Sequence, residues 1–423
     1  MNPARRQTLR WLAAAPATPP GAQAGAWWAG RAARAAPAAL ALPALALPRR
    51  ADAACHAWPA WEAFADGFID TSGRVVEASD TRRRTVSEAQ AYALFFALVA
   101  NQRERFDKLL RWTEDNLAGG DLRRRLPAWH WGRRDDGSWG VLDDNAATDA
   151  DLWIAHTLAE AGRLWGTKHY AERARTLAER VLSESTAELP GLGLALLPGP
   201  RGFTPAPQRW RLNPSYLAPM QLRCLAHHFG GRWQRVHDTA LAVLRHSAPR
   251  GLAPDWATYD GTQQRFLASE PLGSHDAIRV YLWLGLSAGP RGAAPAALRP
   301  LLAHFTPMAR LAEAAGFVPE KIDTQGGSTS GQGPLGFSAA LLPFLRALGR
   351  PAAVQKQLQQ VQSLPPQADA YYDQVLRLFG QGAHEGRFAF AADGSLRPAW
   401  NACTQTQATP PPTPPPTPRR ATP

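Results

Sequence analysis

Helical periodicity runs through most of this 423-residue chain and limits the folds open to it. Between Trp58 and Gly380, apolar residues recur at helical spacing, and Gly, Pro and Asn separate the segments. Strand-like alternation is confined to possible short hairpins near residues 120–140, 250–270 and 386–398. The expected helices lie near residues 58–70, 87–100, 102–117, 149–163, 168–184, 214–229, 231–247, 275–286, 295–314, 335–348, 351–362 and 367–380.

The expected helices are of two kinds. Some are apolar on most sides, as buried helices are, and others carry charged or amide side chains on one face. Alternation of inner and outer helices predicts an all-α toroid of about six helical hairpins, with short β-hairpins in its loops. Because no repeat of fixed length accompanies the alternation, an irregular α-solenoid stays open as the alternative. The apolar segments are 87–100, 214–229, 275–286 and 335–348, and the one-sided segments are 102–117, 168–184 and 351–362.

The net charge of +12 is concentrated at the two ends of the chain. Residues 1–54 contribute +6 through seven Arg and one Asp, and residues 404–423 contribute +2 through Arg419 and Arg420. The part between them keeps only +4 and has no stripe of basic residues interleaved with aromatic ones. A nucleic-acid partner is therefore not expected.

The first residues have the composition of an export signal. The stretch "RRQTLR" (5–10) resembles a twin-arginine motif, and an apolar run at 35–48 precedes "ADA" (51–53), a small-residue cleavage site. We therefore expect residues 1–54 to be a cleaved signal of the twin-arginine or Sec type, and the mature protein to be periplasmic or secreted. The apolar run is shorter than the ~20 residues that span a bilayer, so we expect no transmembrane segment in the mature chain.

The folded domain is expected to cover residues 55–403, and the Pro/Thr-rich residues 404–423 are expected to form a disordered tail. Two of the three cysteines, Cys55 and Cys403, lie at the ends of this domain. In an oxidising compartment they are expected to form a disulfide that ties the termini together. Cys224, inside a helix among Leu and Ala, is expected to be a buried free thiol.

Nothing in the sequence requires a metal or a cofactor, and we expect neither. No cluster of His, Asp and Glu has the spacing of metal ligands, and the histidines at 130, 156 and 275 stand alone along the chain. An isolated histidine is more often a structural residue than a ligand. A monomer accounts for everything seen in the sequence.

One acidic residue stands at the front of the apolar segment "TVSEAQAYALFF" (85–96). Taken alone, Glu88 fits a capping box with Thr85, in which the two side chains satisfy N–H groups at the helix start. A second interpretation makes Glu88 a catalytic acid. The local pattern favours the cap, and the choice depends on the rest of the chain.

The same arrangement recurs at two more helix starts. "NAATDADLW" (145–153) places Asp149 and Asp151 there, and "LGSHDAIRVYLWLG" (272–285) places Asp276 there, with Arg279 one turn later. In a toroid of alternating helices the inner helices begin at one end, so these carboxylates are expected to converge with Glu88. Each acidic residue alone is also explained by the helix macrodipole, which favours it by roughly 0.3–1 kcal/mol.

The loops that lead to these helices are rich in indoles. Trp131 and Trp139 lie close together before Asp149, and Trp210 precedes "NPSY", which contains Tyr216. Paired carboxylates with flat aromatic rings are typical of carbohydrate cleavage, because the rings stack on sugar faces. Core packing explains any one of these indoles as well as substrate binding does.

Three separated motifs are similar to those of glycoside hydrolase family 8. "ATDADLWIA" (147–155) resembles the family signature, "SEAQAYALFF" (87–96) its acid-bearing segment, and "HDAIRVYLWLG" (275–285) its base-bearing segment. The resemblance covers about residues 55–403. Longer stretches such as "LPAWHWG", "PGLGLALLPG" and "GPLGFSAALLPFL" are most similar to the members that act during bacterial cellulose synthesis and export.

The resemblance implies an (α/α)6 barrel and an endo-β-1,4-glucanase that hydrolyses cellulose with inversion at the anomeric carbon. Glu88 would be the general acid and Asp276 the base that activates water, with the two carboxyl groups roughly 6.5–9.5 Å apart. Asp149 would hold the distorted sugar and the water, with Asp151 as its neighbour. Arg279 would steady Asp276.

The remaining expected contacts with the glucan chain come from aromatic residues. Tyr92, Trp131, Trp139, Trp210 and Tyr216 would line the subsites. The cellulose synthesis and export complex is a possible partner on this interpretation. The family's chitosanases and xylanases are the first alternative, and a non-catalytic glucan-binding component of the cellulose secretion machinery is the second.

Overall fold

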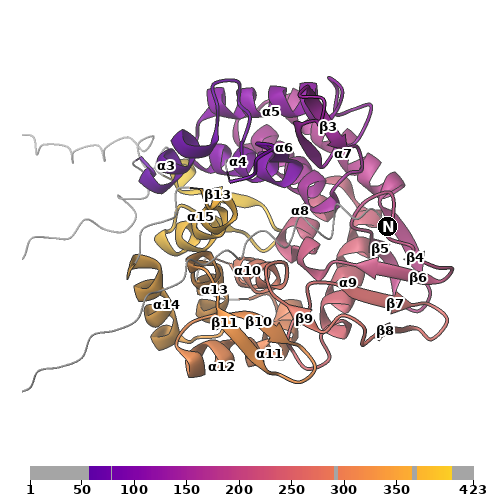
Figure 1. The fold of residues 1–423 in the computed structure, drawn as a ribbon, viewed down its shortest axis with the longest axis vertical. Helices are drawn as coiled ribbons and strands as arrows, with labels where there is room; N and C mark the ends of the chain where they lie inside the picture. The colour runs from indigo at the N-terminus through magenta and orange to yellow at the C-terminus, as the bar shows by residue number, and fades with distance from the viewer. Residues whose placement is uncertain (1–56, 78, 290–293, 364–368, 403–423) are drawn as a thin grey trace, which may run out of the picture. The chain divides into compact units, whose positions relative to one another are not determined.

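The computed structural model describes residues 57–77, 79–289, 294–363 and 369–402 (Figure 1). Contacts divide the chain into two units, residues 1–49 and 50–423, and every described residue belongs to the second. The expected export signal, the Cys55–Cys403 disulfide and the expected tail lie outside the described residues. None of the helices in the described part has both the length and the apolar character that a membrane span requires.

Six helices form the inner layer, as Figure 1 shows. Each packs against the next in chain order. Phe379 on the last of them stacks on Phe95 of the first at 5.4 Å, which closes the ring. Nearly every residue of the first, second and fourth is buried, because these segments are largely apolar; in the second, Glu160 and Arg163 are charged residues beyond the first turn. The inner helices are α4 (Ser87–Val99), α6 (Thr148–Leu164), α8 (Pro219–Phe229), α10 (Ala277–Ser287), α13 (Leu335–Ala347) and α15 (Tyr371–Glu385).

The outer helices bury only one face each. In α5 (Arg103–Leu117), the residues Phe106, Leu109, Leu110 and Leu117 are buried and the charged side chains face outward. Outer helices pack on α4, α6, α8, α13 and α15. The arrangement is an (α/α)6 barrel, so the predicted fold is confirmed. The other outer helices are α3 (Pro59–Phe68), α7 (Lys168–Glu184), α9 (Gly231–His246), α11 (Arg299–His304), α12 (Thr306–Ala315) and α14 (Pro351–Ser363).

Three expected helices differ from the observed ones at their ends. The segment 214–229 begins with a 3₁₀ turn, η1 (Pro214–Tyr216), and α8 starts only at Pro219. The segment 295–314 is divided at Phe305, since Pro307 in the first turn of α12 has no N–H to continue the preceding helix. The last helix runs further than expected and stops at Gly386, which adopts a left-handed φ of 78°.

Short antiparallel strands occupy the loops at all three predicted places. They are β2 (His130–Arg133) with β3 (Trp139–Asp143), β7 (Ala257–Asp260) with β8 (Arg265–Leu267), and β12 (Phe388–Phe390) with β13 (Leu396–Pro398). Further strands were not expected, because they are short and lack alternation. These are β1 (Thr85–Val86), which pairs with β2; β6 (Arg209–Leu212), which pairs with β7; β4 (Thr186–Leu189) with β5 (Gly193–Leu196); and β9 (Leu272–Gly273), β10 (Pro319–Asp323) and β11 (Thr329–Gln332).

Candidate active site

The starts of three inner helices meet at one buried guanidinium group. Nη1 of Arg279 on α10 donates hydrogen bonds to the Tyr92 hydroxyl of α4 and to Asp149 Oδ2 of α6, each at 3.0 Å. Its Nη2 donates to the Ser215 hydroxyl of η1 at 2.8 Å and to Asp276 Oδ1 at 2.6 Å. The predicted convergence of the helix starts is therefore observed, and Arg279 joins four elements that are far apart in sequence.

The helical repeat explains which side chains meet. Asp276 and Arg279 are three residues apart, so they lie on one face of α10 and form an ion pair. Glu88 and Tyr92 are four residues apart on α4 and share its inner face. The Tyr92 ring packs against Trp153 of α6 at 5.9 Å. Glu88 is half-buried, one turn before Tyr92, and its Oε2 is 3.3 Å from the Ser87 hydroxyl.

The capping interpretation of Glu88 is wrong. Thr85 lies in β1, one residue before Val86, and Val86 is the residue that precedes the first turn of α4. The Thr85 hydroxyl accepts a hydrogen bond from Arg74 Nε at 2.8 Å and donates one to the Val75 carbonyl at 2.7 Å. It is therefore engaged away from the helix start, and the sequence pattern of a capping box occurs here without its geometry.

The start of α10 is stabilised by a residue that the sequence analysis missed. Asp255 Oδ1 accepts backbone hydrogen bonds from Ser274 at 2.8 Å, Asp276 at 3.1 Å and Ala277 at 2.8 Å. Asp276 therefore does not have to cap its own helix, and its carboxylate points to Arg279 instead. Burial and then the charge of Asp276 raise the pKa of Asp255 to about 7, although the three hydrogen bonds act against this. A cap supplied from 21 residues upstream leaves no local pattern to detect.

Tyr372, on α15, is a second residue that the sequence analysis did not single out. Its hydroxyl donates a hydrogen bond to the carbonyl of His275 at 2.6 Å, on the residue next to Asp276. Burial raises its pKa well above the usual range of tyrosine, so it acts as a neutral donor. It fixes the backbone next to Asp276, in addition to the hydrogen bonds of Asp255.

Burial and neighbouring charges change the pKa of Asp149. It is 3% exposed, and burial followed by the charge of Glu88 raises its pKa to about 7, with Asp276 adding to the rise and Arg279 opposing it. An ordinary aspartate has a pKa near 4. Asp149 therefore holds a proton over a pH range in which surface carboxylates are fully ionised.

Asp151 lies inside the wall rather than with the other carboxylates. It follows Asp149 by two residues, which turns its side chain about 200° around α6. It is fully buried, and both carboxylate oxygens lack a hydrogen-bond partner among the described residues. Burial, and then the charges of Asp149 and Glu88, raise its pKa well above the ordinary value, so it is neutral. This placement does not favour the predicted contact with substrate.

Aromatic side chains surround Arg279 on the side of η1. The Tyr216 ring lies 5.6 Å from the Arg279 guanidinium carbon and 6.5 Å from the ring of Trp256. Trp256 in turn carries Arg211 over its face at 3.9 Å. Tyr216 is thus where the prediction put it, beside the carboxylates, and Trp256 extends the same wall.

Trp131 and Trp139 form a stack on the β2–β3 hairpin. Their rings lie 5.4 Å apart and nearly parallel, with the Arg74 guanidinium 4.3 Å from the first. Trp131 also packs against Trp112 of the outer helix α5 at 5.3 Å. Trp131 pairs with Thr85 of β1, just before α4, and Trp139 is 45% exposed and offers a flat surface.

Trp210 turns away from Arg279. It precedes Arg211 in β6, and successive side chains of a strand point to opposite faces. Since Arg211 lies over Trp256, Trp210 points to the other face, against Gly261. A Cβ atom at Gly261 would lie 2.7 Å from the indole. Trp210 packs beside the paired strands β6 and β7 in this structure.

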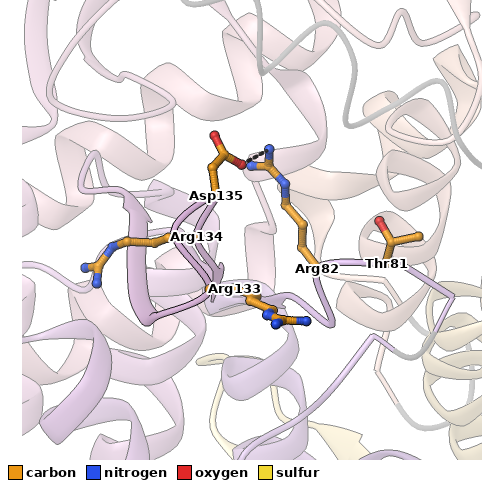
Figure 2. A pocket seen from close by; sticks show the side chains of 6 residues that line it. Thr81, Arg82, Arg133, Arg134 and Asp135 are labelled. Atoms are coloured by element: carbon orange, nitrogen blue, oxygen red, sulfur yellow. Dashed lines mark hydrogen bonds and ion pairs between the residues drawn. The ribbon is translucent and has the colours of Figure 1, made fainter.

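A shallow hollow of about 220 Å³ lies beside the β2–β3 turn (Figure 2). It is lined by Thr81, Arg82, Arg133, Arg134, Asp135 and Gly137. Figure 2 shows Arg82 paired with Asp135, 3.0 Å apart, and both are exposed. Such exposed pairs stabilise a fold by about 0–1 kcal/mol. The hollow includes none of the carboxylates around Arg279, and its chemistry does not suggest hydrolysis.

The carboxylates around Arg279 do not form a metal site. Among the described residues, one group has ligand atoms close enough to share an ion, and it consists of Glu160, Cys224 and His228. These three lie at the far end of α6 from Asp149.

The raised pKa of Asp149 predicts how stability depends on pH. The folded chain holds a proton that the unfolded chain releases between about pH 4 and pH 7, so the free energy of unfolding falls as pH rises through this window. The slope from one such group is at most about 1.4 kcal/mol per pH unit. We expect Asp149→Asn to reduce this slope, measured by urea denaturation at several pH values between 4 and 8.

Asp255 and Asp151 also have raised pKa values, so they too lower the free energy of unfolding as pH rises. Asp149→Asn should therefore remove only part of the pH dependence of stability. Asp238→Asn is the matched control, because this carboxylate on α9 is 64% exposed. An Asp149→Asn protein with the slope of the unchanged chain would contradict the assignment.

The fold and the site together define a class: a helical barrel with converging carboxyl groups suited to cleaving glycosidic bonds. A family model described as Glycosyl hydrolases family 8 matches residues 35–386. The chain belongs to glycoside hydrolase family 8.

Individual relatives agree with this. The endoglucanase of Salmonella typhi is 47% identical, over 83% of this chain and 93% of that protein. The endoglucanase of Xanthomonas axonopodis pv. citri is 47% identical, over 86% and 95%. The crystal structure of endo-1,4-D-glucanase from Vibrio fischeri ES114 has a TM-score of 0.73 and 40% identity, and the match covers 81% of this chain and 99% of that one.

Proposed function

We propose that this glycoside hydrolase is an endo-β-1,4-glucanase that cleaves cellulose chains with inversion, using Glu88 as general acid and Asp276 as general base. The observation that carries the proposal is the hydrogen-bonding of Arg279 to Tyr92, Asp149 and Asp276, which gathers the starts of α4, α6 and α10. The endoglucanases to which the chain is 45–47% identical support the substrate class.

The reaction needs a proton donor on one side of the glycosidic bond and a proton acceptor on the other. Glu88 would protonate the glycosidic oxygen as the bond from that oxygen to the anomeric carbon breaks. Asp276 would take a proton from a water molecule whose oxygen forms the new bond to the opposite face of the same carbon. Each turnover consumes one water and leaves one new reducing end with inverted configuration.

The surroundings suit these two roles. Asp276 is paired with Arg279, which holds its carboxylate in one orientation. The charge of Glu88 contributes to the raised pKa of Asp149, about 7, so these two carboxyl groups lie close enough to influence each other. Asp149 would hold the distorted sugar and the attacking water. Tyr216 and Trp256 would stack on the sugar rings.

The test is the release of reducing ends from carboxymethyl-cellulose, xylan and chitosan by the purified chain. We expect carboxymethyl-cellulose to be cleaved fastest, with an early fall in viscosity because an endo-acting enzyme cuts inside the chain. The first product should be the α-anomer, seen by proton NMR before mutarotation. Faster cleavage of xylan or chitosan would assign the chain to that specificity, and a folded protein inactive on all three would support a glucan-binding role.

We also propose that the enzyme works in the periplasm on cellulose chains made by the same cell, beside the synthesis and export complex. The support is the export-signal composition of residues 1–54 and the motifs shared with family members of that pathway. Cell fractionation of the full-length chain tests the location. Recovery of the protein with the cytoplasmic fraction would contradict it.

A further inference from the structure

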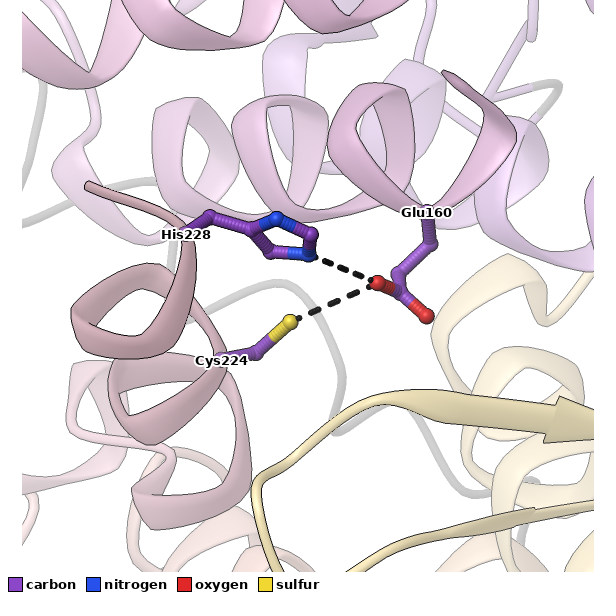
Figure 3. Close-up of side chains that lie close together, drawn as sticks. All are labelled: Glu160, Cys224 and His228. Carbon is purple, nitrogen blue, oxygen red and sulfur yellow. Dashed lines mark hydrogen bonds and ion pairs between the residues drawn. The ribbon is translucent and has the colours of Figure 1, made fainter. Parts of the chain in front are cut away.

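Three side chains of types that commonly bind transition metals meet between α6 and α8, outside the carboxylate site (Figure 3). Glu160 Oε1 lies 3.1 Å from His228 Nε2 and 3.6 Å from Cys224 Sγ. The three ligand atoms all lie within 4.8 Å of one another. Cys224 and His228 are four residues apart, so both project from one face of α8 toward Glu160, as Figure 3 shows.

The distances suit one tetrahedral ion. Zinc–ligand bonds of about 2.0–2.3 Å place neighbouring ligand atoms roughly 3–4 Å apart. Two of the three separations here, 3.1 and 3.6 Å, already fall in that range. A thiolate with an imidazole selects zinc-class ions over magnesium or calcium, which prefer oxygen ligands alone. A fourth position would be open to water.

The surroundings hold the carboxylate in place for such an ion. Leu396 in β13 donates its backbone N–H to Glu160 Oε2 at 2.6 Å, and Arg163 donates to both carboxylate oxygens. Glu160 Oε1 also faces Cys224 and His228. The His228 side chain is 23% exposed, which gives an ion a route from solvent. The charge of Arg163 weakens cation binding, so we expect a moderate affinity.

We propose that Glu160, Cys224 and His228 bind one divalent ion of the zinc class, which fastens α6 to α8. Its role is structural rather than catalytic. Glu160 follows Asp149 by eleven residues on α6, which separates them by about 16 Å along the helix axis. The proposal is independent of the proposed function, because removal of the ion should lower the melting temperature and leave the chemistry at Glu88 and Asp276 unchanged.

Binding is tested on the full chain without a histidine tag, after treatment with a chelator. Zn²⁺ is added in competition with a colorimetric chelator, and we expect about one ion per chain. Cys224→Ser and His228→Gln should each weaken binding at least about tenfold. His227→Gln is the matched control, since this neighbouring histidine on α8 is exposed. The proposal would be overturned if Zn²⁺ did not bind stoichiometrically, or if the original chain and the three variants bound it equally. The three side chains would then be a hydrogen-bonded cluster without an ion.

Two further measurements tie the ion to these ligands. Co²⁺ should give a thiolate charge-transfer band that persists in a Cys55→Ser/Cys403→Ser chain and disappears in Cys224→Ser. Added Zn²⁺ should raise the melting temperature of the original chain and of His227→Gln, because binding to the folded state stabilises it. A band that depends on Cys55 or Cys403 would place the ion elsewhere and refute the site.

Discussion

Glu88→Gln and Asp276→Asn are each expected to lower kcat on carboxymethyl-cellulose by about 100-fold to 10,000-fold, the range supplied by a positioned acid or base. Gln keeps the shape of Glu88 but has no proton to give to the leaving oxygen. Asn at position 276 keeps hydrogen bonding but cannot take a proton from water. Reducing-sugar assays at saturating substrate measure the loss, and circular dichroism shows that the variants are folded.

Glu104→Gln is a matched control for the acid. Glu104 occupies the first turn of α5, as Glu88 does in α4, but it is exposed. Its replacement should leave kcat unchanged. The double variant Glu88→Gln/Asp276→Asn should be little worse than either single one, because groups that act in one step are not additive. Retention of more than about a tenth of the activity by either single variant would refute its catalytic role.

Arg279→Met is expected to destabilise the fold by about 3–5 kcal/mol, the effect of removing one partner from a buried ion pair. Methionine fills similar volume, but Asp149 and Asp276 then lose their common cation. Both carboxylates are buried, and Tyr92 and Ser215 lose their donor as well. Urea denaturation measures the change in the free energy of unfolding.

The double variant Arg279→Met/Asp149→Asn tests the cause. It should recover part of the stability, because one fewer carboxyl group is left without a cation, and coupling between contacting residues is about 0.5–3 kcal/mol. Arg245→Met, at an exposed position on α9, should change stability by less than about 0.5 kcal/mol. Arg279→Met with the stability of the Arg245→Met control would contradict the central role of Arg279.

Much of the fold could be predicted from periodicity. The segments around α4, α10 and α13 are apolar on most sides, and α5, α7 and α14 are amphipathic, so these inner and outer helices were distinguishable before any contact was known. Helix ends were harder to predict. The division near Phe305 depends on one proline, and β4, β9 and β11 are too short to show alternation.

The candidate site was predictable where motif and helix start coincide. Glu88, Asp149, Asp276 and Arg279 stand at helix starts, and the structure brings the last three into direct contact. Asp151 is separated from them by the rotation of its helix. Trp131 lies in β2 and Trp210 lies in β6. The pairing of each strand with its neighbours sets the direction of these side chains, and composition does not reveal that pairing.

Residues that act through long-range backbone contacts left no sequence signal. Asp255 caps α10 from a loop 21 residues away, and Tyr372 reaches the His275 carbonyl from α15. The expectation of no metal site rested on spacing along the chain. Glu160 is separated from Cys224 by 64 residues, so their contact exists only once α6 and α8 are packed together.

The sequence alone determined most of the helices, the inner or outer position of seven of them and the acidic residues at helix starts, because periodicity and first-turn composition are local properties. The tertiary structure decided which of those acidic residues share Arg279 and which one is buried in the wall. It also decided which of the carboxyl groups have a raised pKa. Those outcomes depend on distances and burial between segments that are far apart in the chain. Charge interactions and desolvation act through space, so they become defined only when the barrel closes.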